Sequence, residues 1–129
     1  MIVLLSPAKS LDFETPSPDQ RTTTPELLAN SAKLMATVKK LSSSDLCKLM
    51  KISEKLGDLN FDRNQKWKKN HTEKNSKACV FAFQGDVYQG LKAESLSKTQ
   101  ITFCQKHVRI LSGLYGVLRP LDLLSLIHI

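Results

Sequence analysis

Six side chains that could bind or position a phosphorylated ligand stand on three separate loops of this sequence. Each loop follows an apolar run, and loops that follow elements of one layer can open on the same side of it. Lysine and arginine suit phosphate, while an aspartate, a serine and two tyrosines could orient a nucleotide-like molecule. No serine, cysteine or lysine has a partner base at a supporting spacing, so catalysis remains a hypothesis without a nucleophile. The predicted cleft consists of Ser6, Lys9, Asp86, Tyr88, Tyr115 and Arg119.

A second candidate chemistry is the binding of nucleic acid, because the basic residues are unevenly distributed. The chain carries a formal net charge of +7. Residues 63–77 hold six lysines and arginines against the single acid Glu73, and residues 98–119 hold no acid at all. Clusters of this kind suit phosphate backbones, although a solvated protein surface can have the same composition.

A pair of short helices joined by a tight turn is predicted over residues 41–67. Ser44 is expected to cap the first helix, and the second is expected to begin at Glu54, after a break at residues 51–53. The pattern resembles a helix-hairpin-helix, in which backbone N–H groups meet a DNA phosphate without reading sequence. It departs from that motif where Lys51 and Ser53 replace the usual glycines. The expected DNA-binding residues are Lys9, Lys51, Ser53, Lys55, Arg63, Lys66, Lys68, Lys69, Arg109 and Arg119.

The elements expected to position these residues are short apolar strands and amphipathic helices. Residues 1–5 predict a buried strand that is covered on both faces, and residues 78–83 predict a second strand. A proline-rich loop over residues 14–25 should lead into a helix that begins at Thr24-Pro25-Glu26 and runs to Leu41. The fold class is therefore α+β, a mixed arrangement of strands and helices.

The second half of the sequence predicts a turn, a helix and a further turn. Asp86 after Gly85 favours a cap on a short helix, and Ser97 is expected to cap a helix that ends near Leu111. Gly113 and Gly116 would then allow a sharp C-terminal turn that presents Tyr115 and Arg119.

Length and composition exclude several classes of protein. A chain of 129 residues can bury one core, and 41% hydrophobic residues indicate a globular domain. No apolar run is long enough to cross a bilayer, which makes a cytoplasmic location the default expectation. Three cysteines without CxxC spacing predict reduced, buried thiols, and scattered histidines predict no metal site. No cofactor is expected.

Three blocks of this sequence, taken together, look like one known family. Residues 6–9 (SPAK), 83–91 (FQGDVYQGL) and 111–122 (LSGLYGVLRPLD) resemble the YaaA family of bacterial peroxide-stress proteins and occur in its order. The resemblance implies a role in hydrogen-peroxide stress that limits free intracellular iron, and a mixed α/β fold with a helix-hairpin-helix and a positively charged cleft. Carried across, the hairpin falls on residues 51–55, and the cleft on Lys9, Arg109 and Arg119.

The resemblance ends near Leu124, where the family continues for roughly as many residues again. Residues 1–124 are therefore expected to be the N-terminal part of a single domain, and residues 125–129 a non-native tail. Apolar surface would then be exposed, so we expect the chain alone to be poorly stable or to aggregate.

Two functions of different classes follow from these observations. The first is a cytoplasmic protein of oxidative-stress defence that binds double-stranded or partly unpaired DNA without sequence specificity. The alternative is an enzyme that acts on a nucleotide or phosphorylated small molecule in a cleft with Lys9, Asp86 and Arg119. A third outcome is a fragment with no activity of its own.

Overall fold

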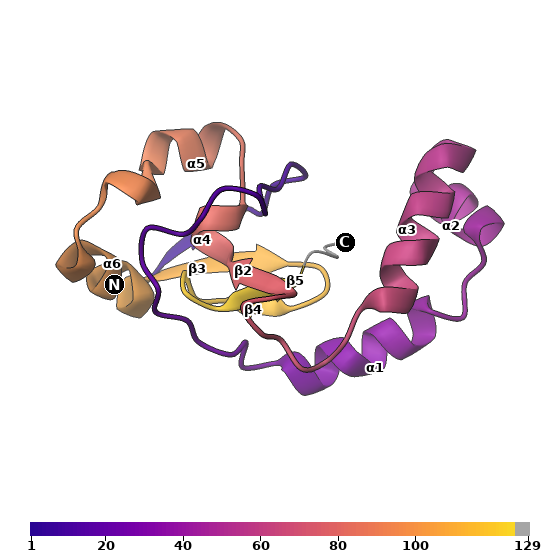
Figure 1. Ribbon diagram of the computed structural model, residues 1–129, viewed down its shortest axis with the longest axis horizontal. Helices are drawn as coiled ribbons and strands as arrows, with labels where there is room; N and C mark the ends of the chain where they lie inside the picture. The colour runs from indigo at the N-terminus through magenta and orange to yellow at the C-terminus, as the bar shows by residue number, and fades with distance from the viewer. Residues whose placement is uncertain (126–129) are drawn as a thin grey trace.

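The computed structural model describes residues 1–125, in which six α-helices and five short strands form an α+β fold (Figure 1). The predicted fold class is confirmed. Ser125 is the last described residue, so residues 126–129 of the predicted tail lie outside the described residues. The helices are α1 (Leu28–Val38), α2 (Ser43–Met50), α3 (Glu54–Lys66), α4 (Cys79–Ala82), α5 (Asp86–Leu91) and α6 (Lys98–His107), with a 3-10 turn at Ala93–Ser95. The strands are β1 (Val3–Leu5), β2 (Ser76–Ala78), β3 (Val108–Ser112), β4 (Gly116–Leu118) and β5 (Leu123–Ser125).

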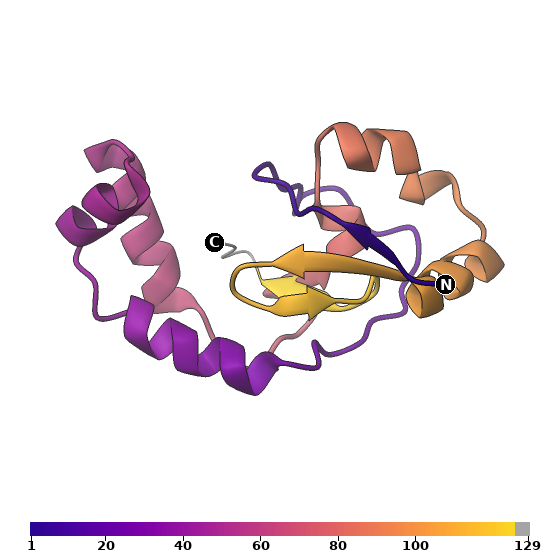
Figure 2. The same cartoon turned by 180° about the vertical axis from the view of Figure 1, so that it is seen from behind.

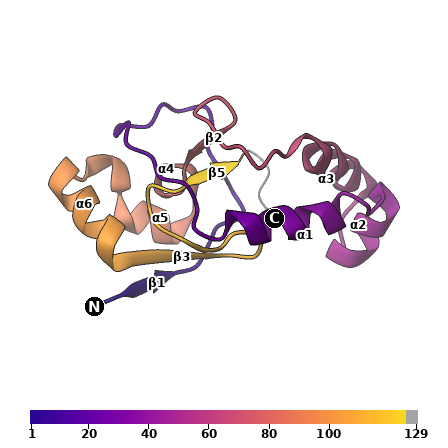
Figure 3. The same cartoon turned by 90° about the horizontal axis from the view of Figure 1, so that it is seen from below.

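The elements divide between two regions. We call α1–α3 the helical arm, and the strands together with α4–α6 the sheet lobe. In Figure 2 α1 begins beside the sheets and extends away from them, and α2 and α3 stand at its far end. Seen from below, α6 lies at one end of the molecule and the α2–α3 pair at the other (Figure 3).

The sheet lobe contains two small sheets whose strands come from distant parts of the chain. In the first, β1 pairs in parallel with β3, and β3 pairs antiparallel with β4. In the second, β2 pairs antiparallel with β5. The main core forms where the inner sheet residues Ile110 and Leu118 meet Phe83, Tyr115 and, from α1, Met35.

Two expected elements differ from the structure because tertiary pairing overrides local pattern. The strand predicted over residues 78–83 ends at Ala78, and α4 follows, since the N–H groups of Cys79 and Val80 bond the carbonyls of Asp122 and Pro120. The helix capped by Ser97 ends at His107, and the apolar residues that follow it form β3 beside β1. A short apolar run fits the periodicity of a helix and that of a strand equally well, so the segment with which its backbone pairs decides which of the two it forms.

Two consequences follow for the turn and for the N-terminal strand. Residues 113–115 close a β-hairpin between β3 and β4 and do not end a helix, although Gly116 has the positive φ of 74° that the pattern favoured. The strand β1 is not covered on both faces, because Leu4 is 61% exposed.

Helix starts in the arm also differ by a few residues. The first helix begins after Leu27, because residues 23–24 bond to the Arg119–Asp122 segment and cannot cap it. The second is capped by Ser42 and not by Ser44: its hydroxyl accepts the Asp45 N–H, and the Asp45 carboxylate accepts the Ser42 N–H. Ser97 does cap α6, through the same reciprocal arrangement with Gln100.

Candidate functional site

The predicted phosphate cleft is divided by the fold, and only one part of it comes together. The Tyr88 hydroxyl donates to the Ser6 carbonyl at 2.6 Å, and burial raises the pKa of that hydroxyl. The Gln84 N–H donates to the Ser10 carbonyl. The loop after β1, which carries Lys9, therefore lies against the turn that leads into Asp86. Asp86 occupies the first turn of α5 and does not cap it, because the N-cap is Gly85 at φ 121°.

Tyr115 is fully buried in the core, where its hydroxyl is bonded within the protein. Its hydroxyl accepts from the Trp67 indole N–H at 3.2 Å and from the Ser125 N–H at 3.1 Å. Because these donors occupy both lone pairs, the hydroxyl hydrogen is left to donate to His71 Nε2, which lies 2.7 Å away. The proton of neutral His71 therefore sits on Nδ1, and desolvation lowers the pKa of this imidazole. Tyr115 is a structural link between the arm and the lobe.

Arg119 is also engaged within the protein. Its guanidinium bonds the fully buried carboxylate of Asp122 at 3.0 Å and the carbonyl of Thr24 at 2.9 Å, and it lies 3.5 Å from Glu26. The Asp122 carboxylate also accepts from the Thr23 hydroxyl at 2.6 Å and from the Arg119 N–H at 2.7 Å. These bonds hold residues 23–24 against the end of β4.

The helical hairpin α2–α3 has the geometry of two closely packed helices. At Gly57 a Cβ atom would overlap Cys47 Sγ and stand 3.0 Å from the Ser43 carbonyl, so only glycine lets the helices approach this closely. Lys51 ends α2 in the left-handed conformation, with φ 55° and ψ 50°. The turn thus adopts at a lysine the backbone conformation that usually requires glycine.

The start of α3 leaves backbone donors available. Ser53 is its N-cap, and the Ser53 hydroxyl and carbonyl accept the N–H groups of Leu56 and Gly57. The N–H groups of Glu54 and Lys55 have no acceptor within the helix, because the first turn of any helix lacks one. Lys51 and Lys55 are both exposed beside these donors.

Most of the other predicted DNA-binding residues lie at or after the end of α3, whereas Arg109 stands apart. The exposed side chains of Arg63, Lys66, Lys68 and Lys69 continue from the hairpin along the end of α3. Arg63 and Lys9 line a pocket of about 520 Å³ together with residues 11–14, which connects the arm with the loop after β1. Arg109 stands apart on β3, where its guanidinium donates to the carbonyls of Gln105 and Val108.

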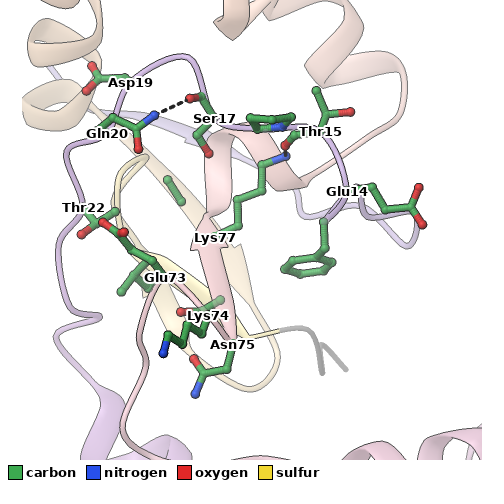
Figure 4. A pocket seen from close by; sticks show the side chains of 15 residues that line it. Glu14, Thr15, Ser17, Asp19, Gln20, Thr22, Glu73, Lys74, Asn75 and Lys77 are labelled. Atoms are coloured by element: carbon green, nitrogen blue, oxygen red, sulfur yellow. Dashed lines mark hydrogen bonds between the residues drawn. The ribbon is translucent and has the colours of Figure 1, made fainter.

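Lys77 is a structural residue, although it belongs to the basic stretch of residues 63–77 that suits a phosphate backbone by composition. Its ammonium donates to the carbonyls of Asp12 and Thr15, at 3.0 and 2.7 Å, and partial burial lowers its pKa. Hydrogen bonds from Thr15 and Glu14 lower the pKa of the Asp12 carboxyl to about 2. Figure 4 shows Lys77 reaching toward Thr15 across a polar pocket of about 470 Å³ between residues 13–22 and 73–78. An aspartate that accepts from the N–H groups two and three residues on is the local signal for this loop.

In residues 1–125 no group of three or more His, Cys, Asp or Glu side chains could hold a metal ion. None of the helices described there is long and apolar enough to cross a membrane. Cys79 is buried, whereas Cys47 and Cys104 are half-buried, and all three thiols are free.

Comparison with known proteins assigns the family. A family model described as "Peroxide stress protein YaaA" matches residues 1–126. The chain belongs to this family. A "UPF0246 protein" from Polynucleobacter asymbioticus is 53% identical over 125 residues, which are 97% of this chain and 48% of that protein. One from Saccharophagus degradans is 51% identical over 125 residues, which are 97% of this chain and 49% of the relative. The chain thus spans about half the length of the curated relatives it matches.

Proposed function

We propose that this member of the peroxide-stress family binds DNA in the cytoplasm without sequence preference, through the α2–α3 hairpin and the basic residues that follow it. The observation that carries the proposal is the left-handed Lys51 at the hairpin turn. It gives the turn the backbone conformation of a glycine and leaves the first N–H groups of α3 available to an anion. The family resemblance links this role to the limitation of free intracellular iron, and that link is part of the proposal.

The charges of the arm support binding to a phosphate backbone. Lys51 and Lys55 flank the free N–H groups at the start of α3, and the N-terminus of a helix favours anions. Four further basic side chains follow within residues 63–69. Phosphate contacts of this kind position a protein on a duplex without reading its bases. Arg109 and Arg119 are left out of the proposed interface because their guanidinium groups already have protein partners.

Glu54 allows a test in which the DNA affinity should rise and not fall. Its carboxylate lies in the first turn of α3, next to the N–H groups assigned to the phosphate. It stabilises the helix but repels an anion at the same place. We therefore expect Glu54→Gln to tighten DNA binding, whereas removal of the neighbouring lysines weakens it.

The test is fluorescence anisotropy with a labelled duplex across a salt series. The variant pair Lys51→Gly with Lys55→Ala removes two charges and keeps the left-handed turn. The slope of log affinity against log salt should flatten by about 0.9 for each phosphate that the protein no longer neutralises. The matched control is Lys98→Ala with Lys106→Ala on α6, at the other end of the molecule, which should leave the slope unchanged. Equal flattening in both pairs, or binding that does not respond to salt, would overturn the hairpin as the interface.

The alternative function, an enzyme acting on a nucleotide or a phosphorylated small molecule, is favoured by one observation. The loop that carries Lys9 lies against the turn that carries Asp86, through the Tyr88–Ser6 and Gln84–Ser10 hydrogen bonds. Asp86→Asn separates the two functions, because DNA binding should survive it and turnover in this cleft should not. Arg119, the third residue predicted for the enzyme cleft, is paired with Asp122. Neither test therefore uses a substitution of Arg119.

A further inference from the structure

The three-stranded sheet has one face in the core and one apolar face in solvent. The pairing register places Leu5, Ile110 and Leu118 together on the inner face, where they pack in the main core. The residues between them point the other way, since side chains alternate along a strand. We call the opposite side the outer face. Its apolar members are Leu4, Leu111 and Val117, with exposed fractions of 61%, 43% and 40%.

Arg109 is the charged residue among the paired strand residues, and its side chain bonds to backbone groups close to it in the sequence. It pairs with Leu4 and therefore belongs to the outer face. Its guanidinium donates to the carbonyls of Gln105 and Val108. The outer face thus offers aliphatic side chains and a single charged group that is already bonded to backbone carbonyls, a composition better suited to an apolar partner than to a nucleic acid.

The strand β1 at this face is held in place but has one open edge. The Met1 carbonyl accepts from His107 Nδ1 at 2.9 Å, and the Ser6 carbonyl accepts from Tyr88, so both ends of the strand are fixed by side chains. Among the residues that the structure describes, only β3 pairs with β1. Parallel strand pairs are normally covered on both faces, and an open apolar edge promotes unwanted pairing.

The relatives contain the polypeptide that could cover this face. The matched 125 residues make up 48% of the Polynucleobacter asymbioticus relative, so about as many residues again are present in that protein. We propose that the outer face is the docking surface for this other half of the relatives' chain, which adds a strand to the open edge of β1 and lays apolar side chains on Leu4, Leu111 and Val117.

The proposal can be tested by placing a charge on the outer face and comparing its effect on stability in two proteins. The first protein is this chain, and the second is a chimera in which this chain replaces the matched 125 residues of the Polynucleobacter asymbioticus relative. The variant is Leu4→Glu. In this chain alone Leu4 is largely exposed, so the change should leave the unfolding midpoint unchanged and raise solubility. In the chimera the same glutamate would be buried without a partner, and the melting temperature should fall by several degrees.

The matched control is Val87→Glu on α5, at a valine that is 44% exposed and outside this sheet. It should have the same small effect in both proteins. Hydrogen exchange supplies a second measurement that needs no substitution, because the N–H groups of β1 that face its open edge should be protected in the chimera and exchange faster in this chain. Two results would overturn the proposal. One is a Leu4→Glu effect that is equal in both proteins, and the other is a stable dimer of this chain that Leu4→Glu dissociates, which would assign the face to a second copy.

Discussion

The helical arm and the sheet lobe are held together by interactions of different range. In the arm, the boundaries of α2 and the start of α3 are set within a few residues: Ser42 caps α2, Lys51 ends it, and Ser53 caps α3. In the lobe, β1 pairs with β3 from the other end of the chain, and Thr23 bonds Asp122. Local interactions stabilise the arm, whereas the lobe depends on contacts that form only when distant segments meet.

The same difference decides what the charged side chains can do. In the lobe, Arg119 neutralises Asp122, Lys77 bonds two carbonyls, and Arg21 joins Asp19 to α6. The basic residues on the hairpin and beyond it, such as Lys55 and Lys68, are exposed. These three basic residues of the lobe are therefore structural, whereas those of the hairpin remain available for a ligand.

The largest expected effect is the removal of the buried carboxylate in the lobe. Asp122→Ala should lower the free energy of unfolding by about 3–5 kcal/mol, because it leaves the Arg119 guanidinium and the Thr23 hydroxyl without their buried partner. The matched change in the arm, Asp45→Ala, removes only the bond that the Ser42 N–H donates in the capping box of α2, and it should lower the free energy of unfolding much less. Urea denaturation of both variants measures the difference. Equal destabilisation would show that the two regions do not differ in this way.

An intermediate effect is expected at the contact between α2 and α3. Gly57→Ala places a methyl group against Cys47 Sγ and the Ser43 carbonyl, and overpacking of this kind costs about 1–3 kcal/mol. The damage should stay in the arm, so hydrogen exchange should accelerate in α2 and α3 and remain unchanged in β3. Adding Cys47→Ala should restore part of the protection. Faster exchange throughout the chain would mean that the arm and the lobe unfold as one unit.

The smallest effect concerns the contact between the segment that follows α3 and the lobe, where His71 meets Tyr115. The pKa of His71 is lowered from 6.5 in the folded protein, so the unfolded chain binds the proton more readily. The stability contributed by neutral His71 is full above pH 6.5 and is lost as the pH falls below that value. Urea midpoints measured between about pH 7.5 and 5.5 should decline, and His71→Gln should flatten the decline. A slope that the variant does not change would assign the effect to another group. The Asp12 and Asp19 carboxyls act in a separate window, since their pKa values of about 2 lie below the ordinary 3.8.

Sequence reasoning succeeded for several local signals, although it assigned the wrong caps to α2 and α5. The helical hairpin, its break at residues 51–53 and the cap at Ser97 are all present, because capping and helical periodicity act over a few residues. It failed where an apolar run could form a helix or a strand. Residues 79–82 were expected as a strand and form a helix, and residues 108–111 were expected as a helix and form a strand. Their backbone partners, at Asp122 and in β1, come from elsewhere in the chain.

The predicted cleft shows the same limit for side chains. A sequence can indicate that Lys9, Tyr115 and Arg119 are chemically suited to a ligand, but not which of them the fold will use for itself. The Tyr115 hydroxyl is hydrogen-bonded to Trp67 and His71, and the Arg119 guanidinium forms an ion pair with Asp122.

The amino-acid sequence by itself determined the family, the fold class and the excess of basic residues. Only the tertiary structure decided which of those charges remain free and which apolar face stays uncovered. The physical reason is that charge and hydrophobicity belong to single residues, whereas burial and pairing belong to segments that meet across the whole chain.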